Sequence, residues 1–417
     1  MSRLPESLDV LRTREFRLLF SGQAVSVLGD RMAVLALAFA VLEIGGSASD
    51  VGLVLAAGAF PLVATVLAGG VVADRASRRA VMVAADVVRV ASQGTMAALL
   101  IAGVAEVWML ALLAGVTGAA TGFFSPASTG LLPEVVLAEQ LQPANGLRAS
   151  AASTGEILGP VAGGVLVAAA GAGWAIAIDA VTFAVSAACL AMLRVPTRVA
   201  AQRSSFVADL REGWVAFRSR RWVWTFVVYF AIGNLLWGAW GVLGPIVSET
   251  KLGGAAAWGT ILAAMGVGTL VGSLLAARVK PHKPLLFAAL ADSLVALPLA
   301  FLAAAPPVAL IAGAALLGGA GIALAISVWE SMLQRHVPGE SLSRVSSYDW
   351  FGSLAFYPLG LAIWGPIAAV IGVSTSLWLA FGLVVVLTLM LISVPDIRHL
   401  PAAAPPVPAS PAESPTP

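Results

Sequence analysis

Long apolar segments occupy most of this chain, and each is long enough to cross a lipid bilayer as one α-helix. We delimit the segments by clusters of charge, glycine and proline, which mark the ends of helices. The pattern predicts six membrane-spanning helices in each half of the chain. They cover residues 17–43, 50–72, 80–103, 107–126, 146–170, 173–194, 223–248, 255–278, 284–304, 308–330, 345–371 and 374–395.

The composition excludes most other classes of protein. Of the 417 residues, 59% are hydrophobic and 11% are charged, whereas a soluble domain carries about 25% charged residues. A soluble enzyme is therefore excluded, and a net charge of +2 is too small for a nucleic-acid-binding surface. Outer-membrane barrels alternate polar and apolar residues and would be less hydrophobic. We predict an all-α membrane protein with twelve transmembrane helices in two six-helix pseudo-repeats.

The two predicted bundles are joined by a basic linker. In the linker, four apolar residues recur at helical spacing between arginines, which predicts an amphipathic helix lying on the membrane surface: Phe206, Leu210, Trp214 and Phe217. The C-terminal tail holds seven prolines without apolar periodicity, which is typical of disorder. The predicted units are an N-terminal bundle over 1–194, the linker over 195–222, a C-terminal bundle over 223–400 and the tail over 401–417.

The basic residues predict how the chain is oriented. Twenty-two of the 24 Lys and Arg residues fall on one side of the twelve predicted spans, which is the asymmetry of cytoplasmic loops. Only Lys251 falls outside, and Arg31 lies within the first span. The mixed-charge N-terminus lacks the pattern of a signal peptide, so we expect the first helix to be retained. We therefore predict a multi-pass protein of the cytoplasmic membrane with both termini in the cytoplasm.

Few side chains suit metal or cofactor chemistry. The single Cys189 excludes a disulfide framework, and the three histidines show no metal-ligand spacing. No ATP-binding G-x-x-x-x-G-K-[ST] loop occurs, which argues against an ATP-driven pump. We expect no metal, no cofactor and no enzymatic activity, and we take the chain to be a monomer.

A basic loop motif follows the second predicted helix. Residues 70–79 read GVVADRASRR, which resembles the G-x-L-A-D-R-x-G-R-R motif of the major facilitator superfamily, with Ser77 where the family has glycine. Gly70 is expected to allow close helix approach, and Asp74 to pair with an arginine or a helix N-terminus. The resemblance implies a gating motif, and the alternative is a plain cytoplasmic basic cluster. Its proposed members are Gly70, Asp74, Arg75, Arg78 and Arg79.

The fifth predicted helix carries a glycine-rich motif. Residues 155–164 read GEILGPVAGG, which resembles the G-x-x-x-G-P-x-x-G-G motif of exporters in the same superfamily, chiefly proton-coupled drug antiporters. Its glycines give a smooth face for helix packing, and generic packing is the alternative interpretation. Residues 21–32 and 142–150 resemble the branch of drug:proton antiporters that includes macrolide and siderophore exporters. The motif residues are Gly155, Gly159, Pro160, Gly163 and Gly164.

Three charged residues lie at membrane depth and are candidates for function. Such a charge costs about 2.5–3.5 kcal/mol at a helix centre and is rarely kept without a use. Asp30 and Arg31 are adjacent in the first span and point about 100° apart, so they cannot simply face each other. Glu156 of the fifth span is the expected partner of Arg31. For Asp30 and Glu156 a proton-coupling role and a structural ion pair both remain open.

Other residues are weaker candidates. Asp179 and Asp292 fall in predicted peripheral helices, where hydrogen bonding between helices is the favoured interpretation, and Glu330 and Asp349 flank a predicted cytoplasmic loop. On the seventh helix, Asn234 and Trp237 share a face with other aromatic residues, and helix breaks near Pro245 and Pro358 are expected to open space. An aromatic cavity with few polar anchors suits amphipathic, including cationic, compounds.

The sequence thus predicts a secondary active transporter that exports a small amphiphilic compound in exchange for protons. Two six-helix halves would rock about a central site, and protonation of Asp30 or Glu156 would bias which side is open. The alternatives are a proton-coupled nutrient importer and a membrane receptor that does not transport. Transport partners are then a small molecule, protons and the lipid bilayer.

Overall fold

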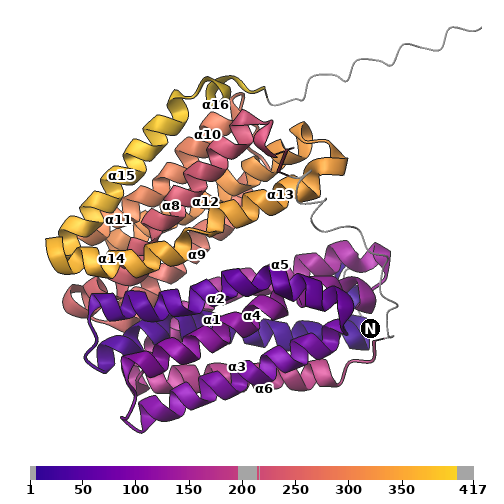
Figure 1. Cartoon of the computed structure of the whole chain (residues 1–417), viewed down its shortest axis with the longest axis vertical. Helices are drawn as coiled ribbons and strands as arrows, with labels where there is room; N and C mark the ends of the chain where they lie inside the picture. The colour runs from indigo at the N-terminus through magenta and orange to yellow at the C-terminus, as the bar shows by residue number, and fades with distance from the viewer. Residues whose placement is uncertain (1–5, 196–213, 216, 402–417) are drawn as a thin grey trace, which may run out of the picture.

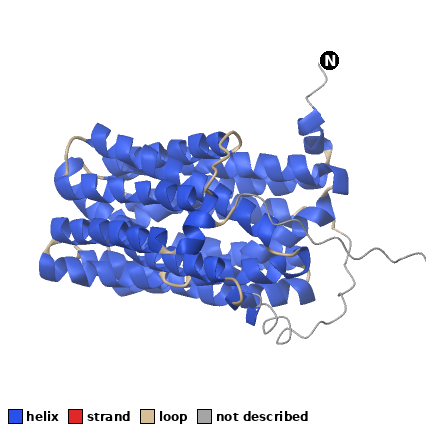
Figure 2. Cartoon of the chain, turned by 90° about the horizontal axis from the view of Figure 1, so that it is seen from above, coloured by secondary structure: helices blue, strands red, loops and turns tan. Residues whose placement is uncertain are grey.

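Helices make up the regular structure of this protein. The computed structural model describes residues 6–195, 214–215 and 217–401, and over this part Figure 2 shows helices and loops and no strand. Twelve helical segments are long and apolar enough to cross a membrane. The prediction of an all-α protein with twelve membrane-spanning helices is confirmed.

Six helices form the N-terminal half, and two of them extend past their predicted ends. Helix α4 continues through Pro126 and Pro133, and α5 begins five residues before the predicted start. A short 3-10 helix, η1 (Glu6–Arg12), precedes them. The bounds are α1 Arg14–Glu43, α2 Ala48–Arg75, α3 Arg78–Ile101, α4 Val107–Val135, α5 Leu141–Ala170 and α6 Ala172–Ala191.

In the described part of the C-terminal half there are nine α-helices, because two of the six predicted spans are broken and one short helix, α16, follows the last span. The span over 284–304 is interrupted by the 3-10 turn η4 (Ser293–Val295), and the span over 345–371 is interrupted before Tyr357. The bounds are α8 Arg221–Val247, α9 Ala255–Ala276, α10 Pro284–Asp292, α11 Ala296–Ala304, α12 Val308–His336, α13 Gly339–Leu354, α14 Tyr357–Ile371, α15 Val373–Ser393 and α16 Pro395–His399.

The two prolines expected to break helices behave differently. Pro358 lies in the first turn of α14, where its missing N–H is tolerated, and the chain bends just before it. Pro245 lies inside α8, which continues to Val247 and passes into a π-helical turn, Ser248–Leu252. The expected break at Pro245 is therefore wrong, and the residue is buried near one end of the span.

The spans run alternately between two faces of the molecule. We call the face where α1 begins and α15 ends the terminal face, and the opposite one the distal face. In Figure 1 the two halves lie against each other at the distal face and diverge toward the terminal face, where α13 and the N-terminus lie. Most of the direct contacts between the halves come from α2 with α14 and from α5 with α9, and α1 and α2 also contact α8.

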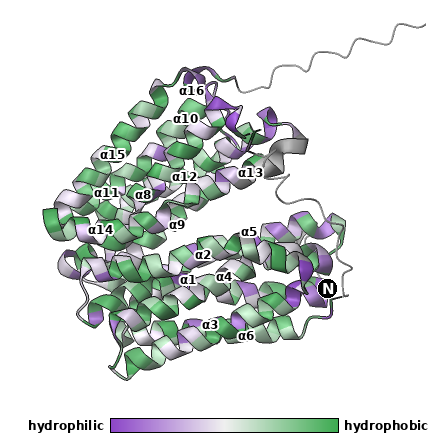
Figure 3. Ribbon diagram, viewed as in Figure 1, coloured by the Kyte–Doolittle hydropathy of each residue, from purple (hydrophilic) through white to green (hydrophobic). Residues whose placement is uncertain are grey.

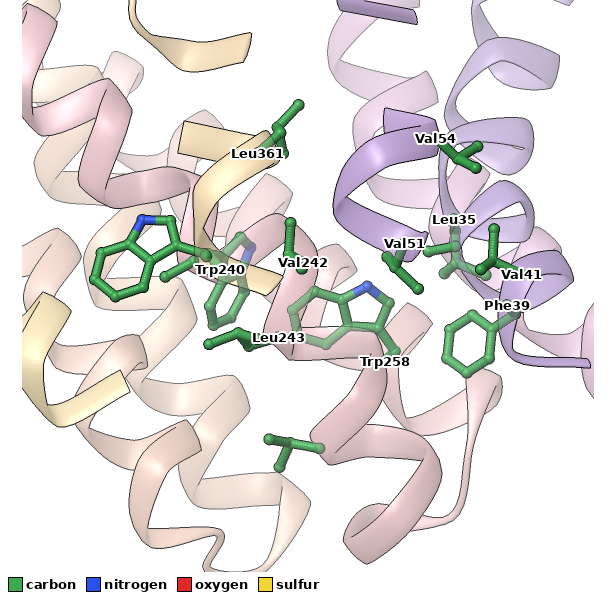
Figure 4. Packing of buried hydrophobic residues seen from close by; sticks show 14 of the residues in the cluster. Leu35, Phe39, Val41, Val51, Val54, Trp240, Val242, Leu243, Trp258 and Leu361 are labelled. Atoms are coloured by element: carbon green, nitrogen blue, oxygen red, sulfur yellow. The ribbon is translucent and has the colours of Figure 1, made fainter. Parts of the chain in front are cut away.

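A continuous apolar core joins the halves at the distal face. It includes Phe39 and Val51 of the N-terminal half and Trp240, Trp258 and Leu361 of the C-terminal half. Figure 4 shows Phe39 and Val51 on one side of this core and the two tryptophans on the other, and the tryptophan rings lie 4.7 Å apart. The core closes the distal side, because these side chains are less than 5% exposed.

The outer surface of the helices suits lipid. Large apolar side chains such as Val370, Leu274 and Val181 are 85%, 65% and 61% exposed. In Figure 3 hydrophobic residues cover most of each helix, and hydrophilic ones gather near helix ends, many of them at the terminal face. Apolar surface on this scale is stable in a bilayer and not in water.

Most of the predicted linker helix and all of residues 402–417 lie outside the described residues. At the linker's end Trp214 and Phe217 stack on each other and on Tyr348 of α13, with ring centroids 5.6–5.8 Å apart. This part of the linker is thus packed against the C-terminal half.

Candidate functional site

A cavity of about 410 Å³ lies inside the C-terminal half. Residues of α8, α10, η4, α12 and α13 line it, so it forms where the broken helices leave space. Aromatic and acidic side chains dominate its wall. The aromatic residues are Phe230, Trp237, Trp329 and Trp350, and the acidic residues are Asp292, Glu330 and Asp349.

Two acids of this cavity, half-buried Asp292 and buried Asp349, accept hydrogen bonds from neutral donors. The Tyr229 hydroxyl donates to Asp292 Oδ2 over 2.8 Å. The Trp329 indole N–H donates to Asp349 Oδ2 over 3.0 Å, and Ser353 Oγ donates to Asp349 Oδ1 over 3.4 Å. No Lys, Arg or His is found among the described residues that line the cavity. The two carboxyls are therefore held in position without a cationic partner.

The predicted residues of α8 line this cavity. Asn234 Nδ2 donates to the carbonyls of Phe230 and Ser353, over 3.0 and 3.1 Å, and so ties α8 to α13 beside the helix break. Trp237 lies one turn further and stacks on buried Trp240 with centroids 5.2 Å apart. The aromatic face predicted on the seventh helix is present, with Asn234 as a brace between helices.

Arg31 and Glu156 do not line the cavity but form an ion pair with each other. Arg31 Nη2 lies 3.1 Å from Glu156 Oε1, and the side chains are 48% and 36% exposed. Both belong to the N-terminal half, on α1 and α5. The pairing expected from the sequence is thus present, and the five residues predicted as one cavity are divided between the two halves.

The fifth-helix motif packs two faces of α5 against different helices. One face meets α1: a methyl group added at Gly159 would lie 2.5 Å from Arg31 Cβ. The other face meets α9 of the C-terminal half, where a methyl at Gly164 would lie 2.5 Å from the Ala255 carbonyl oxygen. A methyl group added at Gly259 of α9 would likewise clash with the Pro160 carbonyl oxygen. Only glycine permits such approaches, and the motif therefore forms part of the contact between the halves.

The other two motif glycines extend the contact with α1. A methyl at Gly155 would lie 2.8 Å from Val27 Cγ1, and one at Gly163 would lie 3.0 Å from Met32 Cα. The motif residues thus have assigned packing partners on two helices, and all five are buried.

The loop motif after α2 ties three helices of the N-terminal half together. Arg78 donates to the Gly130 carbonyl over 2.6 Å and pairs with Glu134 of α4 over 2.9 Å. Arg79 donates to the Leu190 carbonyl over 2.9 Å and to the next carbonyl, at the end of α6. Arg75 is exposed.

Two details of this motif differ from expectation. Gly70 was expected to permit close helix approach, but a methyl there would meet no atom within 4 Å. The close approach occurs at Gly69, where a methyl would lie 2.5 Å from the Gly122 carbonyl oxygen, because adjacent residues point about 100° apart. Ser77 caps α3 with φ −64°, so the position where the family has glycine needs no glycine here. The side chain of Asp74 lies outside the described residues.

A charged cluster is buried inside the N-terminal half. Asp86 and Arg89 of α3 are 0% and 2% exposed and form an ion pair, and Asp179 of α6 is 0% exposed. Asp30 of α1 is half-buried and interacts electrostatically with all three. Arg89 is one of the 22 basic residues that the sequence pattern assigns to the cytoplasmic side, and with Asp86 it was expected to join Asp74 at the cytoplasmic end of α3. The structure instead buries the pair in the bundle.

The two branch-specific segments of the sequence meet at one serine. Gln23 Nε2 of α1 donates to Ser128 Oγ of α4 over 2.6 Å, and Arg148 Nη2 of α5 donates to the same oxygen over 3.0 Å. The resemblance in these segments therefore corresponds to one three-helix contact.

Sequence reasoning ranked three cavity residues too low. Asp292 was assigned to a peripheral helix, and Glu330 and Asp349 to the surroundings of a loop, but all three line the cavity. A signal was present in the pairs Trp329–Glu330 and Asp349–Trp350, where a tryptophan and an acid are adjacent at the ends of apolar segments.

Known proteins resemble this chain over most of its length. The sequence profile of the Major Facilitator Superfamily matches residues 19–353. The chain is 29% identical over 400 residues to the multidrug efflux pump Tap of Mycolicibacterium fortuitum, covering 91% of this chain and 95% of Tap. It is 24% identical over 265 residues to macrolide efflux protein A of Streptococcus pyogenes, covering 63% of this chain and 65% of that protein.

Solved structures share the fold at low identity. The nucleoside transporter NupG superposes with a TM-score of 0.74 at 13% identity, covering 91% of this chain and 98% of NupG. A mutant of the peptide transporter POT gives a TM-score of 0.75 at 12% identity, covering 93% of this chain and 95% of POT. These similarities establish the arrangement of the helices.

Proposed function

This chain belongs to the Major Facilitator Superfamily of transporters, and we propose that it exports a cationic amphiphile from the cytoplasm in exchange for protons. The observation that carries the proposal is the C-terminal cavity, whose aromatic wall holds three acidic residues. Aromatic faces and carboxylates attract a desolvated cation, while the apolar wall binds its hydrocarbon part.

The direction of transport rests on the relatives and on the fifth-helix motif. Two relatives bear the names macrolide efflux protein and multidrug efflux pump, which support export over the uptake of a nutrient. The conformation gives access from the terminal face, since the distal face is closed by the apolar core and the halves diverge at the terminal face. A substrate in the cytoplasm would enter from this side.

The terminal face is proposed to be cytoplasmic. Twenty-one of the 24 basic residues fall on this side once Arg89 is assigned to the bundle interior, which is the asymmetry of cytoplasmic loops. We place the chain in the cytoplasmic membrane with both termini inside and treat it as a monomer without an enzymatic role. A fluorescent protein fused to the C-terminus tests this, because it folds and fluoresces only if that end is cytoplasmic.

Protons are proposed to be exchanged at acids of the N-terminal half. Asp30 and Glu156 are the candidates from the sequence, and Arg31 modulates both because it pairs with Glu156 and interacts with Asp30. A protonated acid is held in a dry site at lower cost than an ionised one, so proton binding and release can change which state is favoured.

Binding of the cation in the cavity and the direction of transport are tested in separate experiments. Binding of a lipophilic cation to purified protein is followed by tryptophan fluorescence, with an uncharged analogue of the same shape as reference. Asp292→Asn and Asp349→Asn each remove a charge-assisted interaction of about 1.5–3 kcal/mol, so the Kd is expected to rise roughly tenfold to 150-fold. Glu106→Gln, at the N-cap of α4 and outside the cavity, is the matched control.

Direction is measured in everted membrane vesicles. Export in exchange for protons predicts that the cation accumulates when the lumen is acidified. Unchanged Kd values in both variants would exclude the cavity as the cation site, whereas absence of accumulation on acidification would exclude proton-driven export.

A further inference from the structure

The buried cluster of the N-terminal half holds more carboxyl groups than cations. We use the name N-half cluster for Asp30, Asp86, Arg89 and Asp179. Asp86 and Asp179 are fully buried, Arg89 is 2% exposed, and Asp30 is half-buried at the edge. Three carboxyls therefore share an interior with one guanidinium.

The guanidinium is already engaged. Arg89 forms its ion pair with Asp86 and lies over the rings of Phe124 and Phe183, 4.1 and 4.3 Å from their centroids. These ring faces stabilise the cation, and they carry no ionisable group. Asp86 and Arg89 thus compensate each other within α3.

Asp179 has neutral partners. Gln93 Nε2 donates to its Oδ2 over 2.8 Å, and Thr182 Oγ1 donates to its Oδ1 over 3.2 Å. Asp30 also lacks a dedicated cation among the described residues, because Arg31 forms its ion pair with Glu156. If every carboxyl were ionised, the cluster would carry two uncompensated negative charges, one of them on fully buried Asp179.

An uncompensated buried charge costs several kcal/mol, and in proteins such a group takes up a proton instead. We propose that Asp30 and Asp179 form a proton-binding site of the N-terminal half, in which the two carboxyls share one exchangeable proton. The proton comes from water as hydronium, converts one carboxylate to a carboxylic acid and returns to water on release. The role of this proton in transport rests on the proposed function, whereas its presence does not.

Close packing of α1 on α6 brings Asp30 within electrostatic reach of Asp179. A methyl group at Gly29 would lie 2.5 Å from Asp179 Oδ1 and 2.3 Å from Thr182 Oγ1, so only glycine lets α1 approach this part of α6. Asp30 follows directly in sequence. Its side chain is half-buried, so Asp30 is the member of the pair that reaches the surface of the bundle.

Unpaired polar atoms continue inward from the two acids. Asp86 Oδ2, Arg89 Nε and Ser186 Oγ are buried and have no hydrogen-bond partner among the described residues. Such atoms can be linked by water, which would relay a proton within the bundle. The charged groups that face the site are Asp30 and Arg31 of α1, Asp86 and Arg89 of α3 and Asp179 of α6, with Glu156 of α5 bound to Arg31.

The site lies in the half opposite to the cation cavity. A proton and a cationic substrate therefore do not compete for one carboxylate, and their coupling passes through the rearrangement of the two halves. This separates the proton site from the cation cavity, which involves only residues of the C-terminal half.

Infrared spectroscopy of the protein in lipid vesicles tests the site without a known substrate. The wild type is expected to show a component of the carboxylic-acid C=O band at neutral pH that is lost in Asp30→Asn/Asp179→Asn. Either single variant is also expected to weaken this component, because removing one carboxylate removes the negative charge that holds the proton on the other. Where the band remains in Asp30→Asn, its hydrogen–deuterium exchange is expected to slow, because Asp30 is the member of the pair that reaches the surface.

Controls make the result decisive. Asp50→Asn, in the capping box of α2, is expected to leave the band unchanged. Asp30→Glu/Asp179→Glu is expected to restore a band, which separates loss of the proton from loss of the fold. A double Asn variant with the wild-type band overturns the site even if transport is proton-driven. A band that disappears as expected while vesicles show no proton-driven transport leaves the site intact and overturns the proposed function.

Discussion

Replacing Gly164 with alanine is expected to disfavour the state in which the distal face is closed. Gly164 of α5 faces α9 of the other half, and an added methyl would lie 2.5 Å from the Ala255 carbonyl oxygen. Ordinary contacts between carbon and oxygen lie at about 3.3–3.6 Å. The two halves must therefore separate by roughly 1 Å at this point, or the backbone must shift.

The size of the effect follows from this overlap. Adding a methyl group to a tightly packed contact costs about 1–3 kcal/mol. Helices α5 and α9 meet at Gly164 only when the distal face is closed, so the penalty acts on that state. It lowers the ratio of the distal-closed to the distal-open population about 5-fold to 150-fold. Alanine also stabilises a helix by about 0.5–1 kcal/mol relative to glycine, but this gain is common to both states.

The matched control is Gly70→Ala. It makes the same change of residue in a helix, and its methyl would meet no atom within 4 Å. Spin labels at Val104 and Lys251, which are exposed at the distal ends of different halves, report the opening in a Cys189→Ser background. Pulsed EPR is expected to show a larger population of long distances in Gly164→Ala than in Gly70→Ala. Identical distance distributions in the two variants would refute the role of Gly164 in distal closure.

Three further changes test individual contacts of the site. Arg31→Gln breaks the half-exposed ion pair with Glu156, which is worth less than about 1 kcal/mol. The melting temperature should therefore stay near that of the wild type while the pH dependence of transport changes. A large loss of stability would contradict this. Arg79→Ala removes the donor to the carbonyls at the end of α6 and should cost about 1.5 kcal/mol in thermal unfolding, with partial recovery in Arg79→Lys. Ser77→Gly restores the residue of the family motif but removes the side chain that caps α3, at a position whose φ of −64° does not need glycine. It should therefore lower the free energy of unfolding by a few tenths of a kcal/mol, and a clear rise in that free energy would argue against the cap.

The fold could be predicted from the sequence because membrane spans depend on length and hydrophobicity alone. The breaks within two spans could not be placed with the same accuracy. At Pro358 the proline itself marks the interruption, whereas the 3-10 turn Ser293–Val295 lies before Pro298 of α11, which has no N–H to donate to the Leu294 carbonyl. Breaks of this kind decide which acids reach a cavity.

The site was predicted less completely because a motif does not define the rotation of its helix. Gly70 and Gly69 are adjacent, yet only Gly69 meets the neighbouring helix. For the same reason Arg89 was grouped with loop cations, since a basic residue near a helix end can point to water or into the bundle. The pairing of Arg31 with Glu156 could be inferred because both charges lie deep in their spans and need a partner.

The ion pair of Arg31 and Glu156 constrains how charge and motion are connected. Both residues belong to the N-terminal half, and Gly159 packs α5 against α1 beside them, so the pair moves with that half as a unit. The contact that must open during rocking is a different one on the same helix, where the Glu156 backbone carbonyl lies close to Gly266 of α9. The side chain of Glu156 therefore does not latch the two halves together. Its charge acts on Asp30 through Arg31, while its backbone forms part of the moving interface. We therefore expect Glu156→Gln to change the proton dependence of transport and to leave the distances across the distal face unchanged.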